Sequence, residues 1–360
     1  MTSIIPARAG AFSAVLLAGV LALTACGGSA PASESSPAED ESSSLVPAAE
    51  GTTTYPLELE TPWGTTELQK RPERIAAVTP SQDDAEILAA LGATPIIASE
   101  WSTDVWLEDA LAQEIPNRFS TGDSKFPVEQ IAAADPDLII VLGADLTDVY
   151  DKLSSVAPVL GTAEQGGSEQ SVANDWEASI TRIGEVLDLQ KAAKNVLADE
   201  EQFYADFRAE NPEFSTLTAS YLVYYGEEGG LQYHSSIGSP AESVFERMGF
   251  AANPNAEEFS YRQEVSEELL SAVDADVILF SDNSDGAHAK ITEQPLFQKL
   301  KAVQDDRLIL IDNRAKEGTF VIDGEEYDGN LPWALARSGP LSSTWAVQQM
   351  APALQAAVTG

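Results

Sequence analysis

The chain has 360 residues, of which 44% are hydrophobic, and its 58 acidic and 20 basic side chains give a formal net charge of −38. A surface this negative repels nucleic acid and anionic lipid headgroups, which excludes nucleic acid as a partner. The hydrophobic fraction is ample for a packed core, and the length suits one large domain or two smaller ones.

Residues 1–25 have the features of a secretory signal peptide. Arg8 is the one basic group among the first ten residues, and an apolar run from Ala11 to Leu23 follows it. That run is shorter than the roughly 20 residues that a membrane-spanning helix needs. A basic start, a short apolar segment and small residues before the cleavage point are typical of export signals.

The signal ends in Leu23-Thr24-Ala25-Cys26, which resembles the bacterial lipobox. In that motif the cysteine receives a lipid, such as palmitate, and becomes the new N-terminus. Cys26 is the only cysteine of the chain, so it has no disulfide partner. The resemblance implies a lipid anchor at Cys26 on the extracytoplasmic face of the cell membrane. An ordinary signal peptide beside an unpaired cysteine is the alternative.

Composition divides the mature chain into four parts. Residues 26–51 are rich in Gly, Ser, Ala, Pro and Glu, bury little, and predict a flexible tether with a reach of roughly 25–30 Å. We then expect an N-terminal α/β lobe at 52–170, a linking helix at 171–207 and a C-terminal α/β lobe at 208–360.

In the first lobe, short apolar runs alternate with one helical pattern. Residues 74–79, 95–99 and 138–142 predict strands, and residues 83–91 predict a helix that Gly92 ends. The continuous apolar run at 138–142 fits a strand that is buried on both faces of a parallel sheet.

The second lobe repeats the alternation. Strands are predicted at 218–225, 277–280 and 308–311, and helices at 240–248, before Gly249, and at 296–303. Asp323-Gly324 predicts a hairpin turn, and its acids are not interpreted as a calcium loop. Between the lobes, Trp176, Ile180, Ile183 and Leu187 form one apolar stripe, so a single rigid helix is expected there. Strands alternating with helices favour the α/β class.

Two stretches of the chain match closely. Residues 129–139, which begin at Glu129, align with residues 268–278, which begin at Glu268. In both, a glutamate precedes an apolar helical turn, two nearby aspartates and an apolar strand. Similarity at such long spacing indicates two lobes built on one plan.

The order of these segments resembles the substrate-binding proteins of ABC importers that capture ferric siderophores, haem or cobalamin. The resemblance covers about Tyr55 to Val358 and rests on five segments, namely 71–78, 87–96, 128–140, 239–249 and 338–343. It implies the class III periplasmic-binding-protein fold, in which two Rossmann-like lobes joined by one long helix bind a ligand between them. It also implies an ABC permease that docks on one glutamate per lobe, and Glu129 and Glu268 match those positions. We expect a monomer.

Ligands of open α/β sheets bind beyond the carboxyl ends of the strands. Aromatic rings supply flat contact area there, and arginine supplies paired donors for anionic oxygens. The candidate ligand-binding residues are Trp101, Trp106, Arg118, Tyr224, Tyr225, Tyr233, His234, Arg314, Trp333 and Arg337. The expected cargo is an Fe(III)-siderophore complex, with no resident metal or cofactor.

Three other functions compete with this one. Haem and cobalamin are carried by the same family. A zinc or manganese receptor would need several clustered imidazoles, and the chain has only His234 and His288. An exported hydrolase would need a nucleophile motif, and the chain contains no G-x-S-x-G, H-E-x-x-H or C-x-x-C sequence, so no catalytic residue is assigned.

Overall fold

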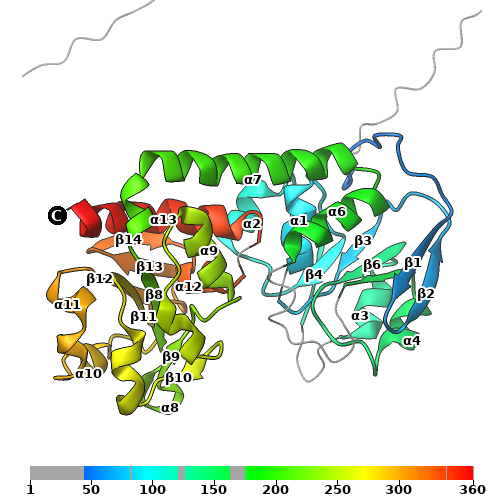
Figure 1. The fold of residues 1–360 in the computed structure, drawn as a ribbon. Helices are drawn as coiled ribbons and strands as arrows, with labels where there is room; N and C mark the ends of the chain where they lie inside the picture. The colour runs from blue at the N-terminus through cyan, green and yellow to red at the C-terminus, as the bar shows by residue number, and fades with distance from the viewer. Residues whose placement is uncertain (1–43, 82, 121–125, 163–174, 338, 360) are drawn as a thin grey trace, which may run out of the picture. The chain divides into compact units, whose positions relative to one another are not determined.

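The computed structural model describes residues 44–81, 83–120, 126–162, 175–337 and 339–359, which form two α/β lobes, each around its own sheet (Figure 1). The signal peptide, Cys26 and most of the predicted tether lie outside the described residues. No helix among the described residues is long and apolar enough to cross a membrane.

The first lobe contains a five-stranded sheet in which every neighbouring pair is parallel. Its order is β5 (Asn117–Phe119), β4 (Ile97–Ser99), β3 (Ile75–Ala77), β6 (Leu138–Val141) and β7 (Val159–Gly161). The three predicted strands of this lobe are confirmed, each slightly shorter than expected. The chain order reverses between β3 and β6, which makes their carboxyl ends the place where such a sheet binds ligands.

Helices and a hairpin surround this sheet. The helices are α1 (Asp83–Ala90), α2 (Val105–Ala110), α3 (Val128–Ala133) and α4 (Tyr150–Ser154), and the hairpin pairs β1 (Leu57–Thr61) with β2 (Gly64–Leu68). Gly92, with a φ of +76°, follows α1 as predicted. Its left-handed backbone lets Ala93 N donate back to Leu88 O at 2.8 Å, which ends the helix.

The second lobe contains a seven-stranded mixed sheet. Its order is β10 (Gln263–Glu264), β9 (Leu231–Tyr233), β8 (Ala219–Tyr224), β11 (Val277–Asp282), β12 (Leu308–Arg314), β13 (Thr319–Ile322) and β14 (Glu325–Asp328). Only β8, β11 and β12 are parallel. The predicted hairpin is confirmed, because Asp323 and Gly324 have φ values of +50° and +81° between the paired residues Ile322 and Glu325.

Most helices of the second lobe are short, and only α13 (Ser342–Thr359) is long. The short ones, in which η marks a 3-10 helix, are η1 (Pro212–Thr216), α8 (Gly226–Gly229), α9 (Pro240–Met248), η2 (Pro254–Glu258), η3 (Glu267–Val273), α10 (Ala289–Thr292), η4 (Phe297–Lys299), α11 (Lys301–Gln304) and α12 (Leu331–Arg337). The helix predicted at 240–248 is confirmed as α9. The one predicted at 296–303 is wrong in its continuity, because Asp274 accepts from Lys301 N at 2.7 Å and starts α11 separately from η4.

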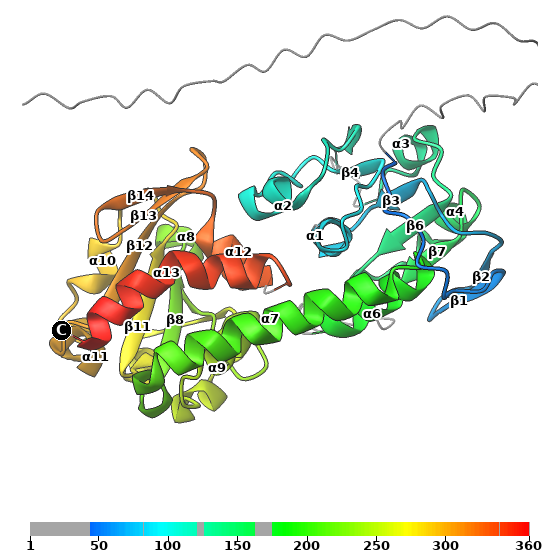
Figure 2. The same ribbon diagram turned by 90° about the horizontal axis from the view of Figure 1, so that it is seen from above.

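The linking segment is also divided. It contains α6 (Trp176–Val186) and α7 (Gln190–Glu210), and α7 is the long helix in Figure 2. Asp188, at a φ of +55°, breaks the expected single helix, and its carboxylate accepts from the backbone N–H groups of residues 51, 52 and 53 at 2.7–2.9 Å. Burial opposes ionisation of Asp188, but these hydrogen bonds outweigh it and lower the pKa to about 2.

The chain packs against the first lobe earlier than expected. Val46 is buried, Leu45 O accepts from Thr94 N at 2.7 Å, and the Glu50 carboxylate accepts from the N–H of Ala192 at 2.9 Å, in the first turn of α7. The prediction that the tether extends to residue 51 is therefore wrong for residues 44–51. These residues supply hydrogen bonds that the break between α6 and α7 needs.

The internal repeat has a structural cause. Asp137 precedes β6, and its carboxylate accepts from Arg74 N at 2.8 Å, just before β3. Asp276 precedes β11, and its carboxylate accepts from Thr218 N at 2.9 Å, just before β8. In each lobe the second aspartate of the repeat thus fixes the start of the neighbouring parallel strand.

Candidate functional site

The carboxyl ends of β3 and β6 are tied together. Thr79, which follows β3, accepts through Oγ1 from Leu142 N at 2.8 Å, and Asp84 accepts from Thr79 N and Ala85 N, each at 2.8 Å. Asp84 is buried, and burial raises its pKa to about 7 despite these hydrogen bonds. The switch point of the first sheet therefore carries a carboxyl group that titrates near neutral pH.

Two residues further along α1, Glu86 joins the two lobes. Its Oε1 accepts from Leu341 N at 2.9 Å, from Ser342 N at 2.8 Å and from Ser342 Oγ at 3.0 Å, at the start of α13. A carboxylate at a helix N-terminus is favoured by the helix dipole. Burial nevertheless raises the pKa of Glu86. A Cβ at Gly339 would lie 2.4 Å from Glu86 Oε1, so this approach requires glycine.

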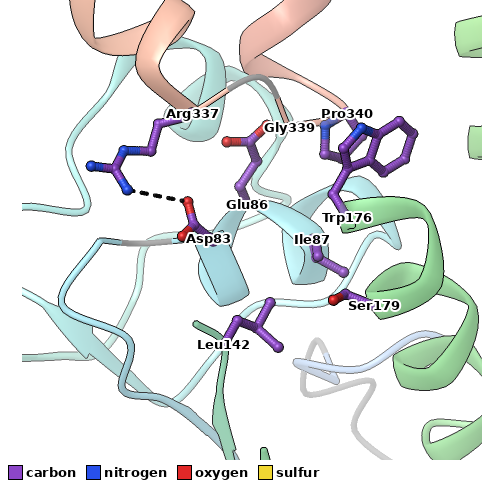
Figure 3. Close-up of a pocket in the computed structure, with 9 residues that line it drawn as sticks. All are labelled: Asp83, Glu86, Ile87, Leu142, Trp176, Ser179, Arg337, Gly339 and Pro340. Atoms are coloured by element: carbon purple, nitrogen blue, oxygen red, sulfur yellow. Dashed lines mark ion pairs between the residues drawn. The ribbon is translucent and has the colours of Figure 1, made fainter. Parts of the chain in front are cut away.

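Figure 3 shows the pocket around this joint. Asp83 of the first lobe faces Arg337 of α12, with 3.7 Å between Oδ1 and Nη1. The Arg337 guanidinium lies 4.0 Å from the centre of the Trp333 ring, a cation–π contact. At the start of α2, burial and the nearby charge of Glu86 raise the pKa of Asp104 to about 7. The predicted residues Trp333 and Arg337 therefore lie beside the first lobe.

Aromatic side chains gather on the second lobe near β8, β9 and β10. His234 is 3% exposed, and its ring centre lies 5.7 Å from that of Tyr221, 6.1 Å from that of Tyr225 and 5.5 Å from that of Tyr261. Burial, helped by the charge of Arg262, lowers the pKa of His234 to about 3. The imidazole is therefore neutral at physiological pH.

Tyr261 and Arg262 were not among the sequence-based candidates. The Arg262 guanidinium lies 5.9 Å from the centre of the Tyr225 ring, and Nη2 is 3.5 Å from Tyr225 Oη. Both residues belong to a turn before β10, an edge strand of two residues. This turn does not follow a parallel strand, so the rule that ligands bind beyond strand ends does not point to it.

Three predicted ligand residues lie in the hydrophobic core. Trp106 is 5% exposed with its ring centre 4.9 Å from that of Trp345, and Tyr233 is fully buried and stacked 4.2 Å from Phe259. Tyr224 is also buried. Their rings contact protein, so the prediction that they bind ligand finds no support in their positions.

The other first-lobe candidates lie at the surface. Trp101 is 62% exposed, which is unusual for so large an apolar side chain. Arg118 is exposed and donates from Nη1 to Ser99 O at 3.4 Å and to Ser102 O. These hydrogen bonds place its guanidinium against the loop that carries Trp101.

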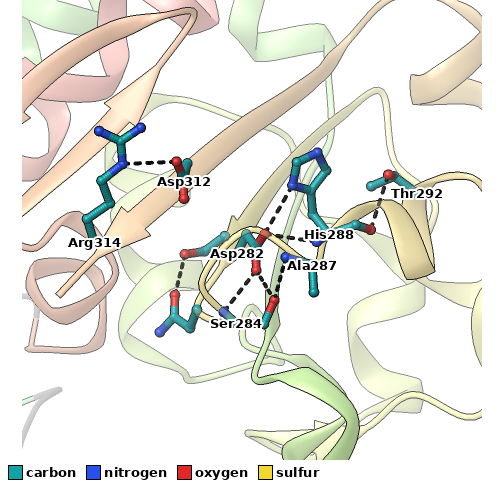
Figure 4. Close-up of polar contacts among 9 residues, drawn as sticks. Asp282, Ser284, Ala287, His288, Thr292, Asp312 and Arg314 are labelled. Carbon is teal, nitrogen blue, oxygen red and sulfur yellow. Dashed lines mark hydrogen bonds and ion pairs between the residues drawn. The ribbon is translucent and has the colours of Figure 1, made fainter. Parts of the chain in front are cut away.

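Arg314 is neutralised by the protein itself. Its Nε lies 3.1 Å from Asp312, and its Nη1 lies 2.5 Å from Glu326. Figure 4 shows it beside a polar network in which the buried Asp282 accepts from Ser284 N and from His288 N, each at 2.9 Å. His288 Nδ1 is 3.0 Å from the same carboxylate. Among the described residues, no group of three or more His, Cys, Asp or Glu side chains could hold a metal ion.

The two repeat glutamates are exposed in both lobes. Glu129 lies in the first turn of α3, and Glu268 lies in the first turn of η3, next to the equally exposed Glu267. No lysine, arginine or histidine of the described segments forms an ion pair with Glu129 or Glu268. Both side chains are therefore available to a partner.

The chain is similar to known proteins over most of its length. A family model described as "Periplasmic binding protein" matches residues 75–315. The chain is 25% identical over 315 residues to "Probable siderophore-binding lipoprotein YfiY" of Bacillus subtilis (strain 168), covering 83% of this chain and 89% of that protein. It is 26% identical over 300 residues to "Fe(3+)-citrate-binding protein YfmC" of the same organism, covering 83% and 87%.

Solved structures share this fold. The structure of Staphylococcus aureus SirA complexed with staphyloferrin B matches with a TM-score of 0.63 at 19% identity, over 83% of this chain and 98% of the SirA chain. The expected class III periplasmic-binding-protein fold, with two α/β lobes, is confirmed.

The joint at Glu86 predicts a large effect of its removal. Glu86→Ala leaves buried N–H groups of α13 without an acceptor, and we expect it to lower the free energy of unfolding by about 2–5 kcal/mol in urea at pH 7. The exposed Glu114, replaced in the same way, is the control and should change it by less than about 0.5 kcal/mol. Equal effects of the two variants would contradict a joint at Glu86.

Proposed function

Since this chain belongs to the periplasmic binding protein family, we propose that it is a membrane-anchored extracytoplasmic receptor that binds a ferric siderophore between its lobes and delivers it to an ABC permease. Members of this family are binding proteins, and the chain is not an enzyme. The names of both Bacillus subtilis relatives concern iron chelates, which supports iron as the cargo.

One observation carries the proposal for the binding site. Arginine and aromatic side chains lie together on the second lobe, where Arg337 stacks on Trp333 and Arg262 lies over Tyr225. Arg337 also contacts Asp83, so this surface adjoins the first lobe. Ferric siderophores often carry negative charge and flat chelating groups, and arginines beside aromatic rings suit both. The chain has 58 acidic and 20 basic side chains, so two arginines held beside aromatic rings on one surface support a role for that surface in binding an anion.

Haem and cobalamin are the alternative cargoes of this fold. Haem would require an axial ligand, and His234 is the histidine nearest to the arginine and aromatic cluster. His234 is 3% exposed and packs against Tyr221, Tyr225 and Tyr261, which leaves no room for a porphyrin on its Nε2. This burial favours a siderophore over haem.

We also propose that Cys26 carries the lipid anchor. The lipobox resemblance supports the anchor, and so does the word lipoprotein in the name of YfiY. Residues 44–51 pack against the first lobe, so they are not part of the proposed tether. We propose Glu129 and Glu268 as the contacts to the permease, because each is exposed at the same place in the repeat of its lobe.

The cargo can be tested with purified residues 44–360. We expect ferric siderophores to quench tryptophan fluorescence, because Trp333 stacks on Arg337 in the proposed site and Trp101 is exposed on the first lobe. A panel of ferric hydroxamate, catecholate and carboxylate chelates is titrated into the protein. Haem and cobalamin, the alternative cargoes, are titrated separately. Quenching by haem or cobalamin alone would contradict the iron assignment.

Docking can be separated from ligand binding. Reversing both charges, with Glu129→Lys and Glu268→Lys, should abolish iron uptake by cells and leave the affinity for ferric chelate within about twofold, because neither residue contacts the proposed ligand surface. Glu114→Lys with Glu210→Lys removes the same charge from two other exposed positions and should leave uptake unchanged. Normal uptake by the first pair, or weakened chelate binding, would contradict the docking role.

A further inference from the structure

Arg262 has a backbone conformation that its side chain does not favour. Six described non-glycine residues have positive φ, and five of them are aspartates; Arg262, at +60°, is the sixth. Aspartate tolerates this region because its short side chain forms local hydrogen bonds, which arginine cannot do in the same way. The residue type at position 262 is therefore not explained by the backbone.

The type of turn around Arg262 also disfavours arginine at this position. Gln263 N donates to Ser260 O at 3.1 Å, which makes residues 260–263 a turn with Arg262 in its third position. Positive φ at that position favours glycine or asparagine. Arg262 N also donates to Tyr233 O at 2.9 Å, so the turn is fixed to β9. Strained residues held in this way cluster at binding sites.

The guanidinium of Arg262 has no anionic partner. It is exposed, and no carboxylate of the described residues lies within 4 Å of it, whereas Arg314 and Arg337 both face carboxylates. Its contacts are with Tyr225, through the ring face and the long contact to Oη. In a protein with 58 acids against 20 bases, an arginine held beside an aromatic ring and left unpaired is available to an external anion.

The neighbours of Arg262 also offer hydrogen-bond donors. Burial raises the pKa of the adjacent Tyr261, so its phenol stays protonated, and Arg337 is close enough to act on it electrostatically. His234 packs against Tyr225 and Tyr261 but is only 3% exposed, so its imidazole supports these two rings without facing the ligand. This surface therefore suits a ligand that is rich in acceptor oxygens and negatively charged.

We propose that Arg262 binds a carboxylate group of the cargo, and that the cargo is an iron chelate with free or iron-bound carboxylates at its surface. The inference rests on the proposed function and names the class of chelate. A guanidinium forms two parallel hydrogen bonds to a carboxylate. A neutral tris-hydroxamate chelate offers no such partner and would leave the guanidinium desolvated and unpaired.

The test compares two chelates and two matched variants. Ferric citrate and ferrichrome, a neutral tris-hydroxamate, are titrated into wild-type protein, Arg262→Gln and Arg307→Gln. Arg307 lies just before the amino end of β12, whereas ligands are expected beyond the carboxyl end of that strand. It has no ion pair among the described residues. We expect wild-type protein to bind ferric citrate more tightly than ferrichrome. Arg262→Gln should weaken ferric citrate binding at least about tenfold, and Arg307→Gln by less than about twofold.

A second variant separates binding from folding. Arg262→Asn places a residue that tolerates positive φ in the turn, so its thermal midpoint should equal or exceed that of wild type while ferric citrate affinity falls as in Arg262→Gln. Unchanged ferric citrate affinity in both Arg262 variants, or tighter wild-type binding of ferrichrome, would overturn this inference and leave the iron-receptor function standing. Failure of wild-type protein to bind any ferric chelate would overturn both.

Discussion

The contact between Glu86 and the N-terminus of α13 is the interaction on which the relation between the lobes depends. The chain passes from one lobe to the other along α7, and Glu86 adds a joint from α1 to α13 without a covalent link. A buried carboxylate is costly unless its hydrogen bonds are made, so losing the contact with α13 would leave Glu86 strongly destabilised in the interior. Gly339 leaves the space for it, and the pair Asp83–Arg337 lies beside it. Together they fix α12, which carries Trp333 and Arg337, against the first lobe.

The two sides of the proposed site differ in charge. On the first lobe, burial and the nearby charge of Glu86 raise the pKa of Asp104 to about 7, and Asp104 lies close enough to Arg337 to interact with it electrostatically. The second lobe contributes Arg262 and Arg337 beside aromatic rings. Acidification toward pH 6 would therefore reduce the negative charge on the first-lobe side, while the arginines stay charged. Arg337 is already partnered and holds the lobes together, whereas Arg262 is free to meet a ligand. The two arginines thus have different roles in this proposal: Arg337 contacts the first lobe and Arg262 contacts the ligand.

The sequence predicted the framework well, because the relevant signals are local. Apolar runs marked the strands, Gly92 and Gly249 marked helix ends, and Asp323-Gly324 marked a hairpin. The break at Asp188 could not be predicted, since it depends on hydrogen bonds from residues more than 130 positions earlier in the chain.

The site was harder to predict than the fold. Tyr224 is the last residue of β8 and lies in the core, whereas Tyr225 follows the strand and contacts Arg262, and sequence position alone did not separate them. Tyr233, the last residue of β9, also lies in the core. Arg262 was missed because a turn before a two-residue edge strand has no periodic signal, and only its backbone conformation shows that it is unusual.

An iron chelate bound between the lobes, beside Arg262 and Arg337, is the feature on which the proposed function depends. Anomalous scattering at the iron K-edge, measured on crystals of residues 44–360 soaked with ferric citrate, locates the metal directly. We expect one iron-centred peak, or one cluster of peaks, between the Tyr225–Arg262 surface and the loop of Trp101. Iron found only on the outer surface of one lobe, away from both arginines, would contradict the claim.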